Sequence, residues 1–427
     1  GNEALDSGSL SGGNNTAIGD NALSANTSGS NNTAIGQAAL CTNLTGGSNV
    51  AVGRCTLKLN TASNNVAVGY HSMCTTSSGT ENTAIGMSSL KSNTTADFNT
   101  ALGNQTLCKN TTGTNNTAVG ACALEANTTG GNNVAVGKSA LITNTTGICN
   151  TALGRTSMEL NTTGSCNVAV GKDALSNNTT AVYNTAVGFQ TLKVGTTATQ
   201  NTGIGALSLD AATTGSYNTG SGYASLSALT TGTCNVSAGY VAGSGITTGS
   251  CNVAIGAHTL SATSTGDRNT AVGLCALKVN TASANTAIGS AALLSNTSGS
   301  SNVALGNSME QNTTGSDNTA AGNGALQANT TGADNTAVGR LSLKANTTGD
   351  SHTAVGLKTL CANTTGLCNT AIGAYSLDAN TTGCCNTAVG LGTLGTNTTA
   401  INNTAIGSCS LFANTTGDSS TAVGTDA

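Results

Sequence analysis

One pattern of small, polar and apolar positions recurs along this chain about every 17 residues. The pentad Asn-Thr/Val-Ala-Val/Ile-Gly first appears at Asn15 and occurs 25 times, ending with a variant that begins at Ser420. The spacing is 17 residues except in three intervals of 16. The idealised unit is N-T-A-V-G-x-x-A-L-x-x-N-T-T-G-x-x, with positions numbered from the first Asn. A fixed period of this length indicates a repeat protein whose units stack on one another.

Positions 2 to 4 of the unit have the composition of a short β-strand. Position 2 is Thr or Val in all 25 units, and position 4 is Val, Ile or Leu in 22. β-Branched residues favour strands. Because side chains alternate along a strand, positions 2 and 4 share one face. We predict that this face points inward and that the Leu or Met of position 9 forms a second inward row.

Two further positions are nearly invariant. Position 5 is Gly in every unit, from Gly19 to Gly424, so the backbone there has positive φ or is approached closely by a neighbouring coil. Position 1 is Asn in 23 units, the exceptions being His352 and Ser420. We expect the Asn amides to hydrogen-bond along the stacking axis and to satisfy the backbone groups of a corner.

The unit predicts an all-β fold, a single-stranded parallel β-solenoid (β-roll) of about 25 coils of 17 residues. A strand this short cannot bury a face alone, so successive strands should pair in parallel at about 4.8 Å. Residues 1–427 form one continuous array, in which the stretch 201–251 departs most from the pattern. That stretch is a candidate bend, softer joint or partner contact. Both chain ends fall inside a unit, so we expect a segment of a longer array or ends covered by neighbouring molecules.

Position 3 is Ala in 22 units and lies on the other face of the strand, which we predict to point outward. A solvent-facing row would be free to vary, so a row this small indicates that another backbone packs against it. That backbone would belong to further chains, giving a filament or a homo-oligomer such as a trimer, or to the returning half of the same coil. The row begins with Ala17, Ala34, Ala51, Ala67, Ala84, Ala101 and Ala118.

Composition removes several classes of function. Charged residues are 7% of the chain and the net charge is −4, so there is no basic surface for nucleic acid. No apolar run approaches the roughly 18 to 20 residues of a membrane-spanning helix. The chain has three His, and no combination of Ser, His and carboxylates stands at a recurrent position. We therefore expect a protein that is not an enzyme and that holds no cofactor or metal.

The pentads N-V-A-V-G at 49–53 and N-V-A-I-G at 252–256 resemble the S-V-A-I-G repeats of trimeric autotransporter adhesin heads. The Asn-Thr-Ala-Ile-Gly arrays are also similar to those of viral and phage tail-fibre proteins. The resemblance covers essentially the whole chain. It implies a trimeric, left-handed parallel β-roll that binds a host surface, the extracellular matrix or their glycans. The chain departs from the adhesin heads in its longer unit, its N-T-T-G turn and its many cysteines.

The 15 cysteines occupy only positions 7, 10, 16 and 17 of the unit. Stacked coils would bring five pairs within disulfide distance, which indicates an oxidising, extracellular setting. The predicted pairs are Cys41 with Cys55, Cys108 with Cys122, Cys149 with Cys166, Cys234 with Cys251, and Cys368 with Cys385 or Cys384. The same rule leaves Cys74, Cys275, Cys361, Cys409 and one of Cys384 and Cys385 without a partner, as free thiols or as links between chains.

The Asn of position 12 begins an Asn-x-Ser/Thr acceptor for N-glycosylation in most units. Two interpretations stay open, because N-T-T-G is also a good turn and a chance acceptor inside a repeat is copied with it. A chain this poor in charge would gain solubility from glycans. The candidates are Asn26, Asn43, Asn93, Asn110, Asn127, Asn144, Asn161, Asn178, Asn296, Asn312, Asn329, Asn346, Asn363, Asn380, Asn397 and Asn414.

Three functions fit these features. The first is a structural extracellular fibre, filament or stalk on a cell or virion surface. The second is an adhesin or viral receptor-binding fibre. The third is an ice-binding solenoid, which requires a regular Thr row on a flat outer face; this hypothesis is weakened if the Thr of position 2 points inward.

Overall fold

The computed structural model describes residues 3–5, 11–262 and 264–427, in which every regular element is a three-residue β-strand. The chain divides into two compact units, residues 1–216 and 217–427. Unit 1 contains β1 (Thr16–Ile18), β2 (Thr33–Ile35), β3 (Val50–Val52), β4 (Val66–Val68), β5 (Thr83–Ile85), β6 (Thr100–Leu102), β7 (Thr117–Val119), β8 (Val134–Val136), β9 (Thr151–Leu153), β10 (Val168–Val170), β11 (Thr185–Val187) and β12 (Thr202–Ile204). Unit 2 contains β13 (Thr219–Ser221), β14 (Val236–Ala238), β15 (Val253–Ile255), β16 (Thr270–Val272), β17 (Thr286–Ile288), β18 (Val303–Leu305), β19 (Thr319–Ala321), β20 (Thr336–Val338), β21 (Thr353–Val355), β22 (Thr370–Ile372), β23 (Thr387–Val389), β24 (Thr404–Ile406) and β25 (Thr421–Val423).

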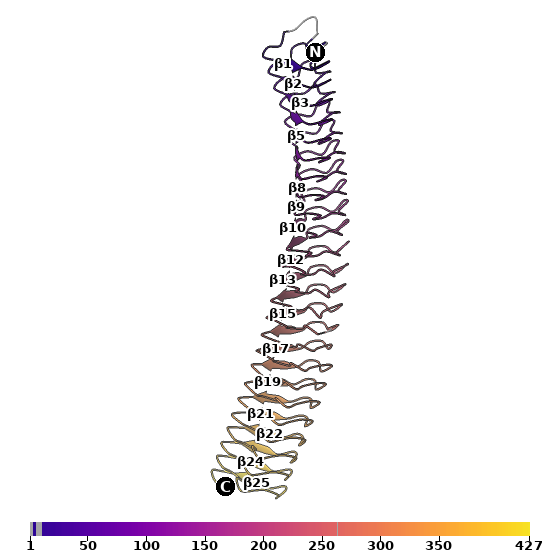
Figure 1. The fold of residues 1–427 in the computed structure, drawn as a ribbon. Coiled ribbons are helices and arrows are strands. Elements are labelled where there is room, and N and C mark those ends of the chain that lie inside the picture. The colour runs from indigo at the N-terminus through magenta and orange to yellow at the C-terminus, as the bar shows by residue number, and fades with distance from the viewer. Residues whose placement is uncertain (1–2, 6–10, 263) are drawn as a thin grey trace. The chain divides into compact units, whose positions relative to one another are not determined.

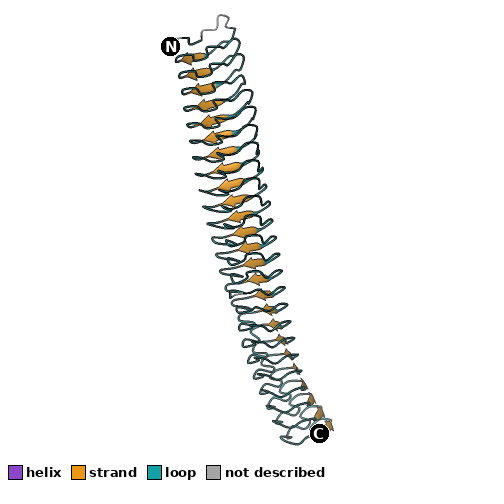
Figure 2. Ribbon diagram, turned by 90° about the vertical axis from the view of Figure 1, so that its right-hand side faces the viewer, coloured by secondary structure: helices purple, strands orange, loops and turns teal. Residues whose placement is uncertain are grey.

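Within each unit every strand pairs in parallel with the next strand in sequence, so the chain is a β-solenoid as predicted (Figure 1). Equivalent positions are paired in register: Ala101 lies opposite Ala118, and Val338 lies opposite Val355. Figure 2 shows the strands of each unit as a column of arrows along one side of the coils. The 16-residue intervals keep this register, since Val50 of β3 still pairs with Val66 of β4.

The strands present the opposite face inward from the one that the apolar pattern predicts. Position 3 is buried in every strand from β2 to β24, for example at Ala135 and Ala354, whereas positions 2 and 4 are half-buried or exposed. The prediction that positions 2 and 4 point inward is therefore wrong. The coil is so thin that its interior accommodates Ala beside the Leu or Met of position 9, and that Leu row is buried as predicted.

Each coil turns at residues with left-handed backbone conformation. Positions 7, 9 and 17 adopt it, as Cys122 (φ 59°), Leu124 (φ 52°) and Asn132 (φ 58°) show in one coil. This conformation disfavours residues other than Gly by about 1–2 kcal/mol each. Stacking against identical turns above and below offsets that cost. The buried Leu row is therefore part of a turn.

The Gly of position 5 both has positive φ and is approached closely by the next coil, the two explanations offered for its invariance. Gly137 has φ +135°, and a Cβ added there would lie 2.5 Å from the carbonyl oxygen of Gly154 in the next coil. Any side chain at this position would push adjacent coils apart.

The irregular stretch 201–251 has a repacked core. Leu229 and Ile246 occupy position 12, where most coils have Asn, and both are fully buried. In the coil of Ile246, position 9 is Gly243 instead of Leu. A Cβ on Gly243 would lie 2.9 Å from Leu226 Cδ2 and 3.4 Å from Ile246 Cδ1. The missing Leu therefore makes room for the added Ile, and the interior stays filled.

This compensation predicts a strong coupling between Gly243 and Ile246. Gly243→Leu should destabilise the protein by about 1–3 kcal/mol through overpacking. Ile246→Asn should destabilise it by about 2–5 kcal/mol through lost apolar packing and a buried amide. The double variant restores the repeat consensus and should be more stable than the sum of the two changes by about 1 kcal/mol or more. Urea denaturation of the four proteins gives the coupling, and strictly additive values would contradict the compensation.

Candidate functional site

The outer face of the sheet is the most regular surface of each unit. Position 2 contributes 18 Thr and 7 Val, and position 4 contributes 22 aliphatic residues; neither position has a charged residue in any coil. The aliphatic side chains stay substantially exposed, with 43% of Ile85 and 41% of Ile372 accessible to solvent. We call these two rows the outer face.

The outer face is long enough to act as an interface. Unit 1 has twelve strands and unit 2 has thirteen, so at about 4.8 Å per strand the rows extend about 53 and 58 Å. A strip about 10 Å wide over these lengths has an area on the order of 500 Å² per unit. This area is comparable with the largest exposed patch on a typical monomer, about 300–600 Å², which is often functional.

The Ala row is not available for packing between chains. Ala34, Ala51, Ala67, Ala84, Ala101 and Ala118 are completely buried, and Ala17 in the first coil is half-buried. Sequence analysis left two partners open for this row, another chain or the returning half of the same coil. In the structure the row packs against the returning half of the same coil. The prediction of association through outward Ala is therefore wrong, because strand alternation places position 3 on the same side as the buried Asn of position 1.

The Asn of position 1 forms the expected ladder along the axis. In one coil, Asn133 Nδ2 donates to the carbonyl oxygen of Gly147 at 2.9 Å and so joins the beginning of the coil to its end. Asn133 Oδ1 accepts the backbone N–H of Asn150 in the next coil at 3.0 Å. The same two contacts recur from coil to coil, which confirms the structural role predicted for this residue.

The Asn of position 12 forms a second buried ladder. Asn329 Nδ2 donates to Asn312 Oδ1 at 2.7 Å and to the Gly332 carbonyl oxygen at 2.9 Å. Its Oδ1 accepts from Asn346 Nδ2 at 3.0 Å. The amide therefore has partners within its own coil and in both neighbouring coils.

Burial of this ladder conflicts with the predicted glycans. Both hydrogens of a typical position 12 amide are donated inside the protein, so a sugar on Nδ2 is incompatible with the folded coil. The fully buried candidates are Asn26, Asn43, Asn93, Asn110, Asn127, Asn144, Asn161, Asn178, Asn296, Asn312, Asn329, Asn346, Asn363, Asn380 and Asn397. Asn414, in the last complete coil, is half-buried. At the fully buried positions the structure therefore favours the turn interpretation of the motif, and glycosylation stays a prediction for Asn414.

Two variants of one acceptor motif separate the structural role from glycosylation. Thr331→Ala removes the motif at an exposed side chain and should change stability by less than about 0.5 kcal/mol. Asn329→Ala removes the same motif together with the buried amide and should destabilise the protein by about 2–4 kcal/mol. Thermal denaturation and intact mass of protein from a glycosylating host measure both effects. A mass loss in Thr331→Ala would restore the glycan interpretation at this site.

All 15 cysteines lie within the described residues and carry free thiols, so the five predicted disulfides are not formed in the structure. Three of the predicted pairs nevertheless lie at equivalent positions of adjacent coils: Cys149 and Cys166, Cys234 and Cys251, Cys368 and Cys385. The remaining predicted pairs, Cys41 with Cys55 and Cys108 with Cys122, join position 10 to position 7 of the next coil. Cys55 is also close enough to Cys74 to influence its thiol, whose pKa is raised mainly by burial and further by Cys55.

His352 replaces Asn in the position 1 ladder and reproduces its contacts. Its Nε2–H donates to the Gly366 carbonyl oxygen at 2.7 Å, and Nδ1 accepts the backbone N–H of Asn369 at 3.1 Å. The ring is 1% exposed. Burial lowers its pKa, an effect that the two backbone hydrogen bonds and Asp350 oppose in part. The neutral Nε2–H form is the one that fits, because a proton on Nδ1 would meet the Asn369 N–H.

This arrangement predicts a pH-dependent stability. The folded pKa of His352 lies below the value of about 6.5 expected in the unfolded chain. Below that pH the unfolded chain binds a proton that the folded coil excludes, so stability falls as pH drops, by at most about 1.4 kcal/mol per pH unit. His352→Asn restores the repeat consensus and should remove this contribution. Urea midpoints of both proteins between pH 8 and 5 test it; parallel curves would show that His352 does not titrate with folding.

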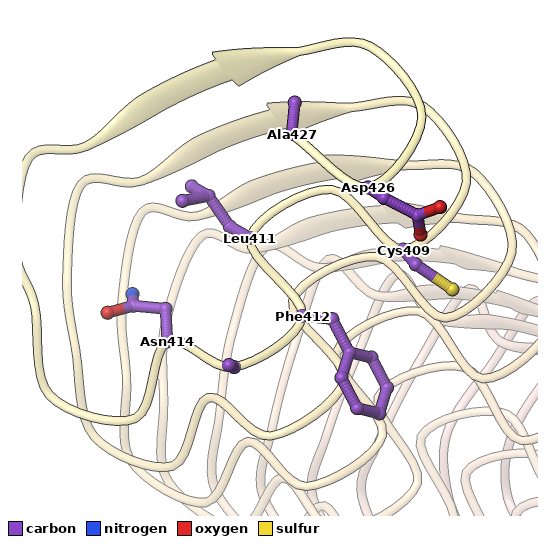
Figure 3. Close-up of a pocket in the computed structure, with 7 residues that line it drawn as sticks. Cys409, Leu411, Phe412, Asn414, Asp426 and Ala427 are labelled. Carbon is purple, nitrogen blue, oxygen red and sulfur yellow. The ribbon is translucent and has the colours of Figure 1, made fainter.

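No cluster that suggests a bound metal ion appears in the part of the chain that the structure describes. Groups of three or more His, Cys, Asp or Glu suited to a metal ion are absent from those residues. A hollow at the last coil is lined by Leu411, Phe412 and Asn414. Figure 3 shows Leu411 pointing into the coil and Phe412 away from it. The hollow is therefore a stacking surface, which the next coil covers elsewhere in the array. The described residues also include no helix long and apolar enough to cross a membrane.

Comparison with known proteins does not assign the chain to a family. No model of a known protein family matches the chain. No curated protein sequence matches it either.

Proposed function

We propose that this chain is a structural fibre or stalk protein that assembles with further copies of itself through the outer face of its sheet. The observation that supports the proposal is the exposure of an uncharged Thr/Val and aliphatic strip along each unit. Each unit offers on the order of 500 Å², so two copies that pair over one unit would bury about the 1,000 Å² in total that a specific interface needs.

A second copy of the chain is the partner that this surface fits. The ridges of position 4 repeat at about 4.8 Å along the stacking axis, and another copy carries the same repeat. Neither row has a charge that would select a partner of opposite sign. The proposed role involves no catalysis, cofactor or nucleic acid.

The extracellular part of the proposal has less support than the assembly. The buried position 12 amides withdraw the argument from glycosylation. What supports an extracellular fibre is the set of cysteine pairs in adjacent coils and the resemblance to adhesin heads and tail fibres. An adhesin or receptor-binding role stays a prediction, since no feature of the described residues favours a particular host ligand.

Lysines on the outer face should separate the chains. Val338 and Ile372 lie two coils apart at position 4 and are 39% and 41% exposed. The unmodified chain should sediment as an assembly, whereas Val338→Lys with Ile372→Lys should shift it toward the 41.2 kDa of a single chain. Thr331→Lys with Thr365→Lys places the same charges on exposed turn residues, each in the coil immediately before that of Val338 or Ile372, and should leave assembly unchanged. Sedimentation velocity distinguishes the three proteins.

A monomeric parent chain over its whole soluble concentration range would contradict the proposal. Ice binding would then become the better function, because the structure removes the objection raised against it: the 18 Thr of position 2 point outward in a regular row. Thermal hysteresis of the monomer, lost in the outer-face lysine variant and kept in the turn variant, would identify that activity.

A further inference from the structure

The six cysteines of position 17 are arranged as neighbours. Position 17 is otherwise occupied by residues as different as Asn132, Tyr183, Arg268 and Asp334, so the backbone there does not require Cys. All six of its cysteines nonetheless fall in adjacent coils, as Cys149 and Cys166, Cys234 and Cys251, Cys368 and Cys385. Isolated cysteines, such as Cys275 and Cys361, stand at other positions. This pairing indicates that the two thiols act together.

Backbone hydrogen bonds hold each pair in register. The N–H of Cys166 donates to the carbonyl oxygen of Ile148, the residue before Cys149, at 3.0 Å. The N–H groups of Cys251 and Cys385 make the same contact with Thr233 and Leu367, both at 2.9 Å. The paired residues are therefore separated by one coil spacing of about 4.8 Å, which lies within the Cα separation of about 4.4–6.8 Å spanned by disulfides.

The thiols are also accessible and close to each other. Five of the six cysteines are exposed, and Cys166 is half-buried. The thiols of Cys368 and Cys385 are close enough for Cys368 to raise the pKa of Cys385. Desolvation raises the pKa of Cys385, and the neighbouring Cys368 and Cys384 raise it further. Exchange at this pair should therefore accelerate as the pH rises and more thiolate forms.

We propose that the three position 17 pairs are redox sites that close disulfides between adjacent coils by exchange with a small-molecule disulfide. One thiolate attacks the small disulfide, forms a mixed disulfide and releases one small thiolate. The second protein thiolate then attacks the protein sulfur of that mixed disulfide and releases the other small thiolate. Two protein thiols are oxidised to one disulfide, and one small disulfide is reduced to two thiols. This inference does not depend on assembly through the outer face.

The pair of Cys149 and Cys166 gives the sharpest test, because Arg155 lies between them in sequence. The folded full-length chain is incubated with glutathione disulfide, its remaining thiols are alkylated, and the protein is then unfolded and digested with trypsin. Peptides 139–155 and 156–172 should be recovered mainly as one disulfide-linked species. Peptide 194–268, which holds Cys234 and Cys251, should carry neither alkyl group nor glutathione.

Single-cysteine variants supply the control. In Cys166→Ser, Cys149 has lost its partner and should carry bound glutathione, while the bridge between Cys234 and Cys251 still forms. Cys275→Ser, at an isolated thiol of the same chain, should leave all bridges unchanged. If Cys149 and Cys166 of the parent chain each carry glutathione, or both stay alkylated while Cys275 reacts, the proposal is overturned.

The same digest also shows whether Cys55 forms a disulfide with Cys41 or with Cys74. Cys55 lies alone in the short peptide 55–58, Cys41 in 1–54 and Cys74 in 59–91. A link from peptide 55–58 to either neighbour identifies which of the two competes successfully for Cys55. Absence of any link there would show that Cys55 closes no bridge to Cys41 or Cys74.

Discussion

The hydrogen bonds of one buried amide determine most of this fold. In most coils the position 1 Asn joins the start of the coil to the position 15 carbonyl and accepts an N–H from the next coil, as Asn133 does with Gly147 and Asn150. An amide with these partners must lie inside the coil, because both partners are backbone groups that water does not reach. Strand alternation then turns position 3 inward and positions 2 and 4 outward.

The sequence alone predicts the period, the parallel in-register stacking, the buried Leu row and the need for Gly at position 5. It does not predict which face of each strand points into the coil, because the prediction assumed that the larger apolar residues point inward. The information that could have corrected it was present. Asn at position 1 and Gly at position 5 share a face with position 3, and an Asn ladder that satisfies a corner has to be inside. The left-handed conformation of Leu124 could not have been read from its residue type, since Leu disfavours it.

The phase of the strand has a direct consequence for the surface. The coil uses its interior for amides and small residues, and it leaves its β-branched and aliphatic side chains on the outer face. Few charged side chains are available elsewhere to keep such a surface apart from others like it. The candidate interaction surface therefore differs from the predicted one. The position 3 row, expected to pack between chains, lies in the core. Positions 2 and 4, expected in the core, form the outer face that can pack between chains.

A stack of coils limits how far any one side chain can act. Each residue contacts its own coil and the two adjacent ones, as in other one-dimensional repeat proteins. Local exceptions are therefore absorbed locally: His352 reproduces the Asn contacts it replaces, and Ile246 fills the space that Gly243 leaves. The paired cysteines of position 17 also act only between adjacent coils, since a disulfide there would join two neighbouring coils. The outer face is different, because its two rows continue along every coil of a unit. A feature of that length can specify the alignment of one chain against another, which contacts limited to adjacent coils cannot do.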